Sequence, residues 1–338
     1  MPAIIRWGMR PEILLVVACL TCAGCRGEGK DAGAGAEPVE IHRFDKALFR
    51  LIEAGNDVGI QGELLCDYPE MMEVTGKDIL NMQSSATPGF FDRLVGYYSE
   101  PTLQGLYRDA LAAYDSVTDL AKTLGSAFAY LGENLPAMPL PRVYMHVSGL
   151  RQNVWVAENL LSLSIDKYLG KDYPLYREFF YEYQREKMQP CRMAPDYLTG
   201  WLMAEYPFAG NEDVLLERMI YEGKIKYIVS EALPELPLPT LMGFTQSACA
   251  WCEKNEGELW KTIVERKHLY TPDLSTTDKY LRETPATFLS GEAPGHVGLW
   301  IGLQIVRRYM KQTGLGLERL MRENNAQEIL TRSGYKPF

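Results

Sequence analysis

The chain is poor in the side chains that most enzymes use for metal binding or nucleophilic attack. It has 4 histidines and 7 cysteines in 338 residues, and Cys19, Cys22 and Cys25 crowd into the extreme N-terminus. It also lacks a Gly-x-Ser-x-Gly nucleophile motif, a phosphate-binding loop and a dinucleotide-binding motif. These absences argue against the common serine hydrolases and nucleotide-dependent enzymes.

Positive charge is also scarce. Lysine and arginine number 35 against 44 acidic residues, which gives a net charge of −9 at pH 7. Nucleic-acid binding rests on clustered basic residues that neutralise phosphates, and no basic stripe is present. We therefore expect no nucleic-acid partner.

The N-terminus has the three-part layout of a secretory signal. Arg6 and Arg10 precede the apolar run Ile13–Ala18, which is too short to span a bilayer, and small residues and cysteines follow. A small residue before a cysteine is typical of a lipoprotein whose thiol receives a diacylglycerol. Cys19 and Cys25 are both candidates for lipid attachment, so the signal peptide covers residues 1–24 or 1–18. A cleaved, soluble periplasmic protein is the alternative.

Composition divides the rest of the chain into a tether and a domain. Residues 25–40 are rich in glycine, alanine and charge, which indicates a flexible tether. Residues 41–338 are predicted to form a single globular domain, and 46% of the whole chain is hydrophobic, enough for a large core.

Periodicity within this domain predicts an α+β, mostly helical fold. Residues 142–147 and 154–165 are β-rich and are predicted to form two strands, which helices flank on either side. Residues 41–52 and 102–131 each read as one helix. Thr245 is predicted to cap a further helix that runs to about residue 268.

Five separated segments together carry a family resemblance. They are Ser164–Tyr176, Leu215–Val229, Trp251–Trp260, Pro294–Met310 and Ala326–Pro337. In order and spacing they resemble the gliding-motility lipoprotein B family of Bacteroidota. The resemblance implies a lipid-anchored protein of the cell envelope, on the periplasmic face of the outer membrane or at the inner membrane, with an envelope protein as partner. The oligomeric state stays open.

That family is in turn similar to predicted zinc peptidases with an H-E-x-x-H helix, which implies a zincin-like (gluzincin-type) domain with a small central sheet flanked by helices. The motif needs two histidines as zinc ligands, a glutamate as general base and a later acidic ligand. Here Ala204 and Phe208 stand at the histidine positions, Glu205 at the base and Glu222 at the third ligand. Two ligands are missing, so we expect no zinc, no other cofactor and no catalytic residue; Glu222 is then a structural carboxylate.

Other candidate residues favour structural roles. Cys249 and Cys252 form a C-x-x-C within a predicted helix, which suggests packing rather than redox chemistry. His296 favours a solvent-exposed helix start, with ligand binding as the alternative. An aromatic cluster between Tyr173 and Tyr183 is expected in the core, with a peptide- or sugar-binding groove as the alternative.

Three functions remain in competition. The preferred one is a non-catalytic envelope lipoprotein that binds a partner or supports assembly of an envelope machine. The second is a metal-dependent peptidase with a rearranged site around Glu205, Glu222 and His296. The third is a lipoprotein that binds a peptide or a glycan.

Overall fold

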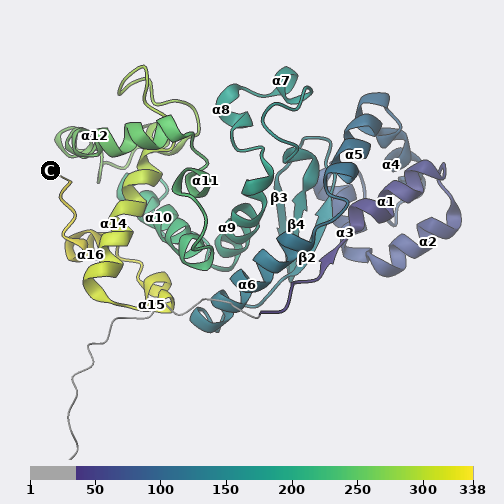
Figure 1. Ribbon diagram of the computed structural model, residues 1–338, viewed down its shortest axis with the longest axis horizontal. Coiled ribbons are helices and arrows are strands. Elements are labelled where there is room, and N and C mark those ends of the chain that lie inside the picture. The colour runs from purple at the N-terminus through teal and green to yellow at the C-terminus, as the bar shows by residue number, and fades with distance from the viewer. Residues whose placement is uncertain (1–35, 338) are drawn as a thin grey trace, which may run out of the picture. The chain divides into compact units, whose positions relative to one another are not determined.

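A computed structural model describes residues 36–337, and these residues form a mostly helical α+β fold around a small mixed sheet (Figure 1). The signal segment, Cys19, Cys25 and most of the tether lie outside the described residues. The helices before the sheet are α1 (Phe44–Glu53), α2 (Val58–Asp67), α3 (Pro69–Val74), α4 (Phe90–Tyr98), α5 (Pro101–Ala113) and α6 (Thr118–Asn134), with a π-helical turn at Thr75–Ile79.

The sheet has the strand order β1-β2-β4-β3. Strand β1 (Ile41–His42) runs parallel to β2 (Arg142–His146), β2 runs parallel to β4 (Leu160–Ser164), and β3 (Val154–Ala157) is an antiparallel edge strand. The strand predicted at residues 142–147 is confirmed. The single strand predicted over 154–165 is wrong: Asn159 takes a positive φ of 55°, and the chain turns there between β3 and β4.

The second half of the chain supplies the remaining helices. They are α7 (Tyr176–Phe179), α8 (Glu182–Arg185), α9 (Met193–Glu205), α10 (Leu215–Ala232), α11 (Leu238–Met242), α12 (Gln246–Glu265), α13 (Leu274–Leu281), α14 (Val297–Thr313), α15 (Leu317–Arg322) and α16 (Ala326–Ser333). The predicted cap of α12 is confirmed, because the Thr245 Oγ1 accepts a hydrogen bond from the Ala248 amide at 3.0 Å.

Two long helices predicted from the sequence are shorter in the structure. Residues 102–131 divide into α5 and α6, which are separated at Tyr114–Val117. Residues 41–52 begin with β1 before α1 starts at Phe44. In both cases, residues on either side of the break contribute to the same core. Apolar residues therefore keep recurring at helical spacing across the break, and the sequence pattern does not show where it lies.

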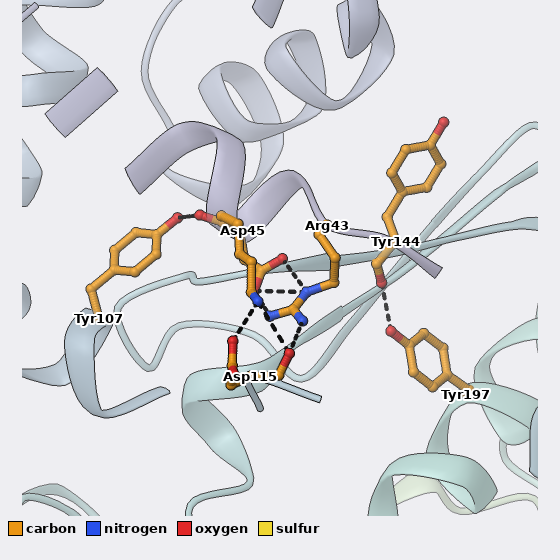
Figure 2. A network of polar contacts seen from close by, with 7 residues as sticks. Arg43, Asp45, Tyr107, Asp115, Tyr144 and Tyr197 are labelled. Atoms are coloured by element: carbon orange, nitrogen blue, oxygen red, sulfur yellow. Dashed lines mark hydrogen bonds and ion pairs between the residues drawn. The ribbon is translucent and has the colours of Figure 1, made fainter. Parts of the chain in front are cut away.

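A polar network holds the start of the domain to α5 and to the segment between α5 and α6 (Figure 2). The Arg43 guanidinium donates two hydrogen bonds to the fully buried Asp45 carboxylate, from Nε at 2.9 Å and from Nη2 at 2.6 Å. The Tyr107 hydroxyl donates to the Asp45 carbonyl at 2.9 Å, and Lys46 pairs with Asp115 at 2.7 Å. The Arg43 Nη1 also donates to the Asp115 carbonyl at 3.3 Å, so the buried ion pair has a further hydrogen-bond partner, which such a pair needs.

Helix α9 connects the sheet to the C-terminal helices. It packs on β3 and β4 and then against α10 (Figure 1). The Tyr197 hydroxyl donates to the Tyr144 carbonyl of β2 at 2.5 Å (Figure 2), and the Trp201 Nε1 donates to the Pro139 carbonyl at 2.9 Å. A β-carbon at Gly200 would lie 2.8 Å from the Val154 side chain, so glycine allows α9 to approach the edge strand closely.

Candidate functional site

The segment aligned with the zinc-binding motif straddles the end of α9. Ala204 and Glu205 occupy the last turn of the helix, whereas Phe208 lies in the loop beyond it. Pro207 has no amide hydrogen to continue the helical hydrogen bonding, and it disfavours a helical conformation at the preceding residue. Positions 204 and 208 therefore do not share a helical face in this chain.

Phe208 is part of an aromatic contact between this loop and α10. Its ring centroid lies 5.2 Å from that of Tyr221, and the Arg218 guanidinium lies 5.8 Å from the Phe208 centroid. The Tyr221 hydroxyl donates to the Tyr206 carbonyl at 3.0 Å. The loop is thus held to α10 by ring packing and a hydrogen bond where a metalloenzyme would place an imidazole.

Glu205 and Glu222 do not line the same cavity. A cavity of about 240 Å³ is lined by Glu205, Phe208 and one face of α10 that includes Tyr221 and Lys224, and Glu222 is not part of its lining. Glu222 instead pairs with Arg218 at 3.2 Å. Burial raises the pKa of both carboxyl groups, and Arg218 opposes that rise at Glu222. Glu205 and Phe208 therefore share a cavity from which Glu222 is separate.

The side of α10 that carries Glu222 meets α9 at a buried lysine. The Lys226 Nζ donates to the Thr199 Oγ1 of α9 at 3.1 Å. Burial lowers the pKa of Lys226 to about 7, and the nearby cations Arg192 and Lys187 lower it further, against the carboxylates of Asp196 and Glu222.

Arg192 and Asp196 complete the contact from the α9 side. They form an ion pair, and Arg192 also donates to the carbonyl groups of Thr240 and Leu241. The Tyr168 hydroxyl donates to the Asp196 Oδ2 at 2.9 Å. We call one set of neighbouring residues the buried charged cluster. Its members are Lys187, Arg192, Asp196, Glu222, Lys226 and His296, the last of which is described in the next paragraph.

His296 differs from the exposed helix start expected from the sequence. It does precede α14, in a left-handed conformation with φ of 55°, but its Nδ1 atom is buried and has no hydrogen-bond partner among residues 36–337. Burial lowers the pKa of His296 to about 3, and the charges of Lys187, Lys226 and Arg192 act in the same direction. The imidazole is therefore neutral at physiological pH, and its unprotonated nitrogen can accept a hydrogen bond.

A larger cavity lies beside this cluster, and we call it the α8–α12 pocket. Its volume is about 660 Å³. Its walls come from Tyr183 in α8 and Glu186 and Lys187 just after it, from several residues of the segment 243–254 at the start of α12, and from the loop between α13 and α14. Lys187 and His296 belong both to the buried charged cluster and to the lining of this pocket. A ligand in the pocket would therefore lie next to the cluster.

Family comparison agrees with the resemblance drawn from the sequence. The family model described as "Gliding motility protein GldB" matches residues 29–337. The chain belongs to the GldB family. It is thus a member of a family of gliding-motility lipoproteins, and the segments Leu215–Val229 and Pro294–Met310 that carried the resemblance build the packed pair α10 and α14. No curated protein and no solved structure matches the chain.

Two further observations concern the envelope setting and metal binding of this GldB-family chain. No helix between residues 36 and 337 is long and apolar enough to cross a membrane. Within the same residues, no three histidine, cysteine, aspartate or glutamate side chains converge as a set of metal ligands.

The C-x-x-C segment lies inside α12. Cys249 and Cys252 are both buried and free, one helical turn apart. Burial raises the pKa of Cys249 to about 11, and it raises the pKa of Cys252 as well. Reactive thiols need a lowered pKa and exposure, so these surroundings favour packing over redox exchange.

The sheet contains a polar pair that sequence reasoning missed. The His146 Nδ1 and the Ser162 Oγ lie 2.7 Å apart, and both residues are buried between β2 and β4. Burial lowers the pKa of His146 to about 3. A serine beside a histidine resembles a nucleophile and its base, but this pair is closed to substrate. The sequence carries no local signal for this pair, because the two residues are 16 positions apart and meet only when β2 and β4 pair.

Proposed function

We propose that this protein is a non-catalytic, lipid-anchored component of the cell envelope that binds an envelope protein partner or supports assembly of the gliding machinery. Cys25 or Cys19 carries the lipid, residues 25–40 serve as the tether, and residues 41–338 form the functional domain. The site of action is the periplasmic face of the outer membrane, or the inner membrane. The GldB family supports the envelope setting.

One observation carries the non-catalytic part of this proposal. Phe208 stands where the second zinc-binding histidine is required, and its ring packs on Tyr221 beneath Arg218. A phenyl ring offers no lone pair to a metal, and a guanidinium next to the site repels a cation. Ala204, at the other histidine position, has an exposed methyl group as its side chain.

A degenerate zincin-like fold belongs to the same proposal. In support, the sheet is small and mixed, its edge strand β3 is antiparallel, and α9 packs directly against that strand. Helix α10 follows α9 and carries Glu222 at the aligned ligand position. In this proposal the helices of an ancestral peptidase persist as a scaffold, and the metal ligands have been replaced.

Complementation of a deletion strain tests the proposal. We expect Glu205→Gln to restore gliding as well as wild type does, because a general base that does no catalysis is dispensable; loss of a working base reduces catalysis by about 10²–10⁴-fold. The purified full chain should contain no stoichiometric zinc and cleave no peptide. Tightly bound zinc that is lost on Glu222→Ala, together with loss of gliding in Glu205→Gln, would replace this proposal with the rearranged peptidase.

The anchor is tested separately. Cys19→Ser and Cys25→Ser are compared for membrane association and for the mass of the mature N-terminal peptide. We expect one of the two variants to lose the lipid and to release the protein from the membrane fraction, with gliding reduced. If both variants keep the lipid, neither cysteine is the attachment site.

A further inference from the structure

The α8–α12 pocket has aromatic walls that open to solvent. Tyr183, Phe244 and Trp251 line it and are partly buried. At its rim Tyr181 stacks on Tyr183, with ring centroids 5.8 Å apart and an angle of 8° between the planes. Tyr181 is 73% exposed. Large aromatic surfaces left in contact with water in this way mark interaction sites.

Two charged residues that line the same pocket, Lys187 and Glu186, form ion pairs that leave some of their hydrogen-bonding positions open. Lys187 pairs with Glu283 at 2.8 Å, and Glu186 pairs with Lys171 at 2.9 Å. An ammonium group has three donors and a carboxylate about four acceptor positions, so each pair can still bond to a ligand. His296 also belongs to the lining, and its Nδ1 is buried and has no partner among the described residues.

The side chains that line the α8–α12 pocket favour some classes of ligand over others. A strongly charged anion is disfavoured, because three glutamates but only two lysines line the pocket and its histidine is neutral. An extended peptide gains much of its affinity by pairing its backbone with a strand edge. The walls here are helices and loops, and the edge strand β3 contributes nothing to the lining. A neutral ligand with many hydroxyl groups and flat apolar faces fits best.

We propose that the α8–α12 pocket binds a carbohydrate, one or two sugar rings of a glycan chain. The C–H faces of a sugar ring pack against the negative faces of aromatic rings, which Trp251 and Tyr183 supply. Hydroxyl groups bond to the Lys187–Glu283 pair and to the Glu186 carboxylate. The volume of about 660 Å³ lies within the range of small-ligand sites. This inference goes beyond the anchoring and assembly role and does not depend on it.

The experiment measures binding of defined probes to the full-length protein in detergent. Chitotetraose and cellotetraose are the sugar probes, and tetra-alanine and inorganic phosphate are the competing classes. Titration calorimetry is combined with tryptophan fluorescence, to which Trp251 contributes. We expect at least one oligosaccharide to bind and to change the fluorescence, whereas the peptide and phosphate do not.

Variants connect that binding to the pocket. Trp251→Ala should weaken oligosaccharide binding about tenfold or more, Trp251→Phe should keep most of it because a ring remains, and Lys187→Met should weaken it about fivefold. Tyr270→Ala, which removes an exposed ring outside the pocket, is the matched control and should bind like wild type. Tyr183→Ala provides a second test if Trp251→Ala fails to fold.

Three outcomes would overturn the inference. One is that no oligosaccharide binds. Another is that binding is equally strong in Trp251→Ala and Tyr183→Ala, which would place the sugar elsewhere. The third is that tetra-alanine binds with the same sensitivity to these variants, which would make the pocket a peptide site.

Discussion

Gly223 of α10 lies directly against the backbone of Gly302 of α14. A β-carbon at Gly223 would stand 2.5 Å from the Gly302 carbonyl oxygen, and one at Gly302 would stand 2.6 Å from the Met219 carbonyl carbon. Backbone atoms cannot move aside as the end of a flexible side chain can. The two longest segments of the family resemblance therefore meet at a crossing that only glycine permits on both helices.

Gly223→Ala and Gly302→Ala should each lower the free energy of unfolding by on the order of 3 kcal/mol, because the added methyl group forces the two helices apart. Urea unfolding monitored by circular dichroism measures the change. Gly105→Ala on α5 is the matched control, since a β-carbon there would meet nothing within 4 Å. Alanine is the better helix former, so the control should be unchanged or more stable. A Gly223→Ala variant as stable as wild type would contradict the crossing.

Lys226→Met should stabilise the protein at neutral pH and flatten its pH dependence. The pKa of Lys226 falls from 10.5 in the unfolded chain to about 7 in the fold, so the unfolded state binds more protons between these values. The stability of the wild type therefore rises as pH increases from about 7 to 10.5. Below pH 7 the buried ammonium imposes its full penalty, on the order of a few kcal/mol.

Unfolding of wild type and Lys226→Met at about pH 6, 8 and 10 measures this effect. The advantage of the variant should be largest at the lowest pH and small at the highest. The relevant neighbours are Arg192, Lys187, Asp196 and Glu222, which both proteins retain. Lys122→Met on the exposed side of α6 is the control and should match wild type at every pH. A constant difference between wild type and Lys226→Met would show that Lys226 does not titrate between these pH values.

The sequence predicted those features of the fold that depend only on residues a few positions apart in the chain. Thr245 caps α12 because its hydroxyl reaches an amide three residues on, a geometry that the sequence alone specifies. The turn at Asn159 carried a similar signal, since asparagine tolerates positive φ, but the apolar residues on both sides obscured it.

The buried charged cluster could not be predicted in the same way. Lys226 lies four residues after Glu222, a spacing that is typical of a solvent-exposed helical pair. Its burial depends on Thr199 of α9, 27 residues away in sequence, and its pKa depends on Arg192 and Lys187. His296 is similar, because packing among distant segments buries its Nδ1. Such contacts depend on tertiary structure.

Native-state alkylation should separate the four cysteines of the described chain into two classes. Cys66 and Cys191 are exposed, whereas Cys249 and Cys252 are buried with raised pKa values. Iodoacetamide reacts with the thiolate, so we expect rapid labelling of the exposed pair and little of the buried pair near pH 7.5 until urea is added, as read by peptide mass spectrometry. Labelling of Cys252 as fast as Cys66 would revive the redox interpretation of the C-x-x-C segment.

The Arg43–Asp45 pair should matter far more to stability than the neighbouring Lys46–Asp115 pair. The Asp45 side chain is fully buried, so Arg43→Met leaves a carboxylate without its counterion and should lower the free energy of unfolding by about 3–5 kcal/mol. Adding Asp45→Asn removes the stranded charge and should recover part of the loss. Both changes are read from urea unfolding.

Lys46→Ala is the internal control for this comparison. It breaks an ion pair in which the Asp115 side chain is 84% exposed, and exposed pairs contribute little because water screens them. We expect its unfolding midpoint to stay close to that of wild type. If Arg43→Met unfolds no more readily than Lys46→Ala, the first residues of the domain are not held by the buried pair, and the contact between Tyr107 and the Asp45 carbonyl would have to hold that end of the fold instead.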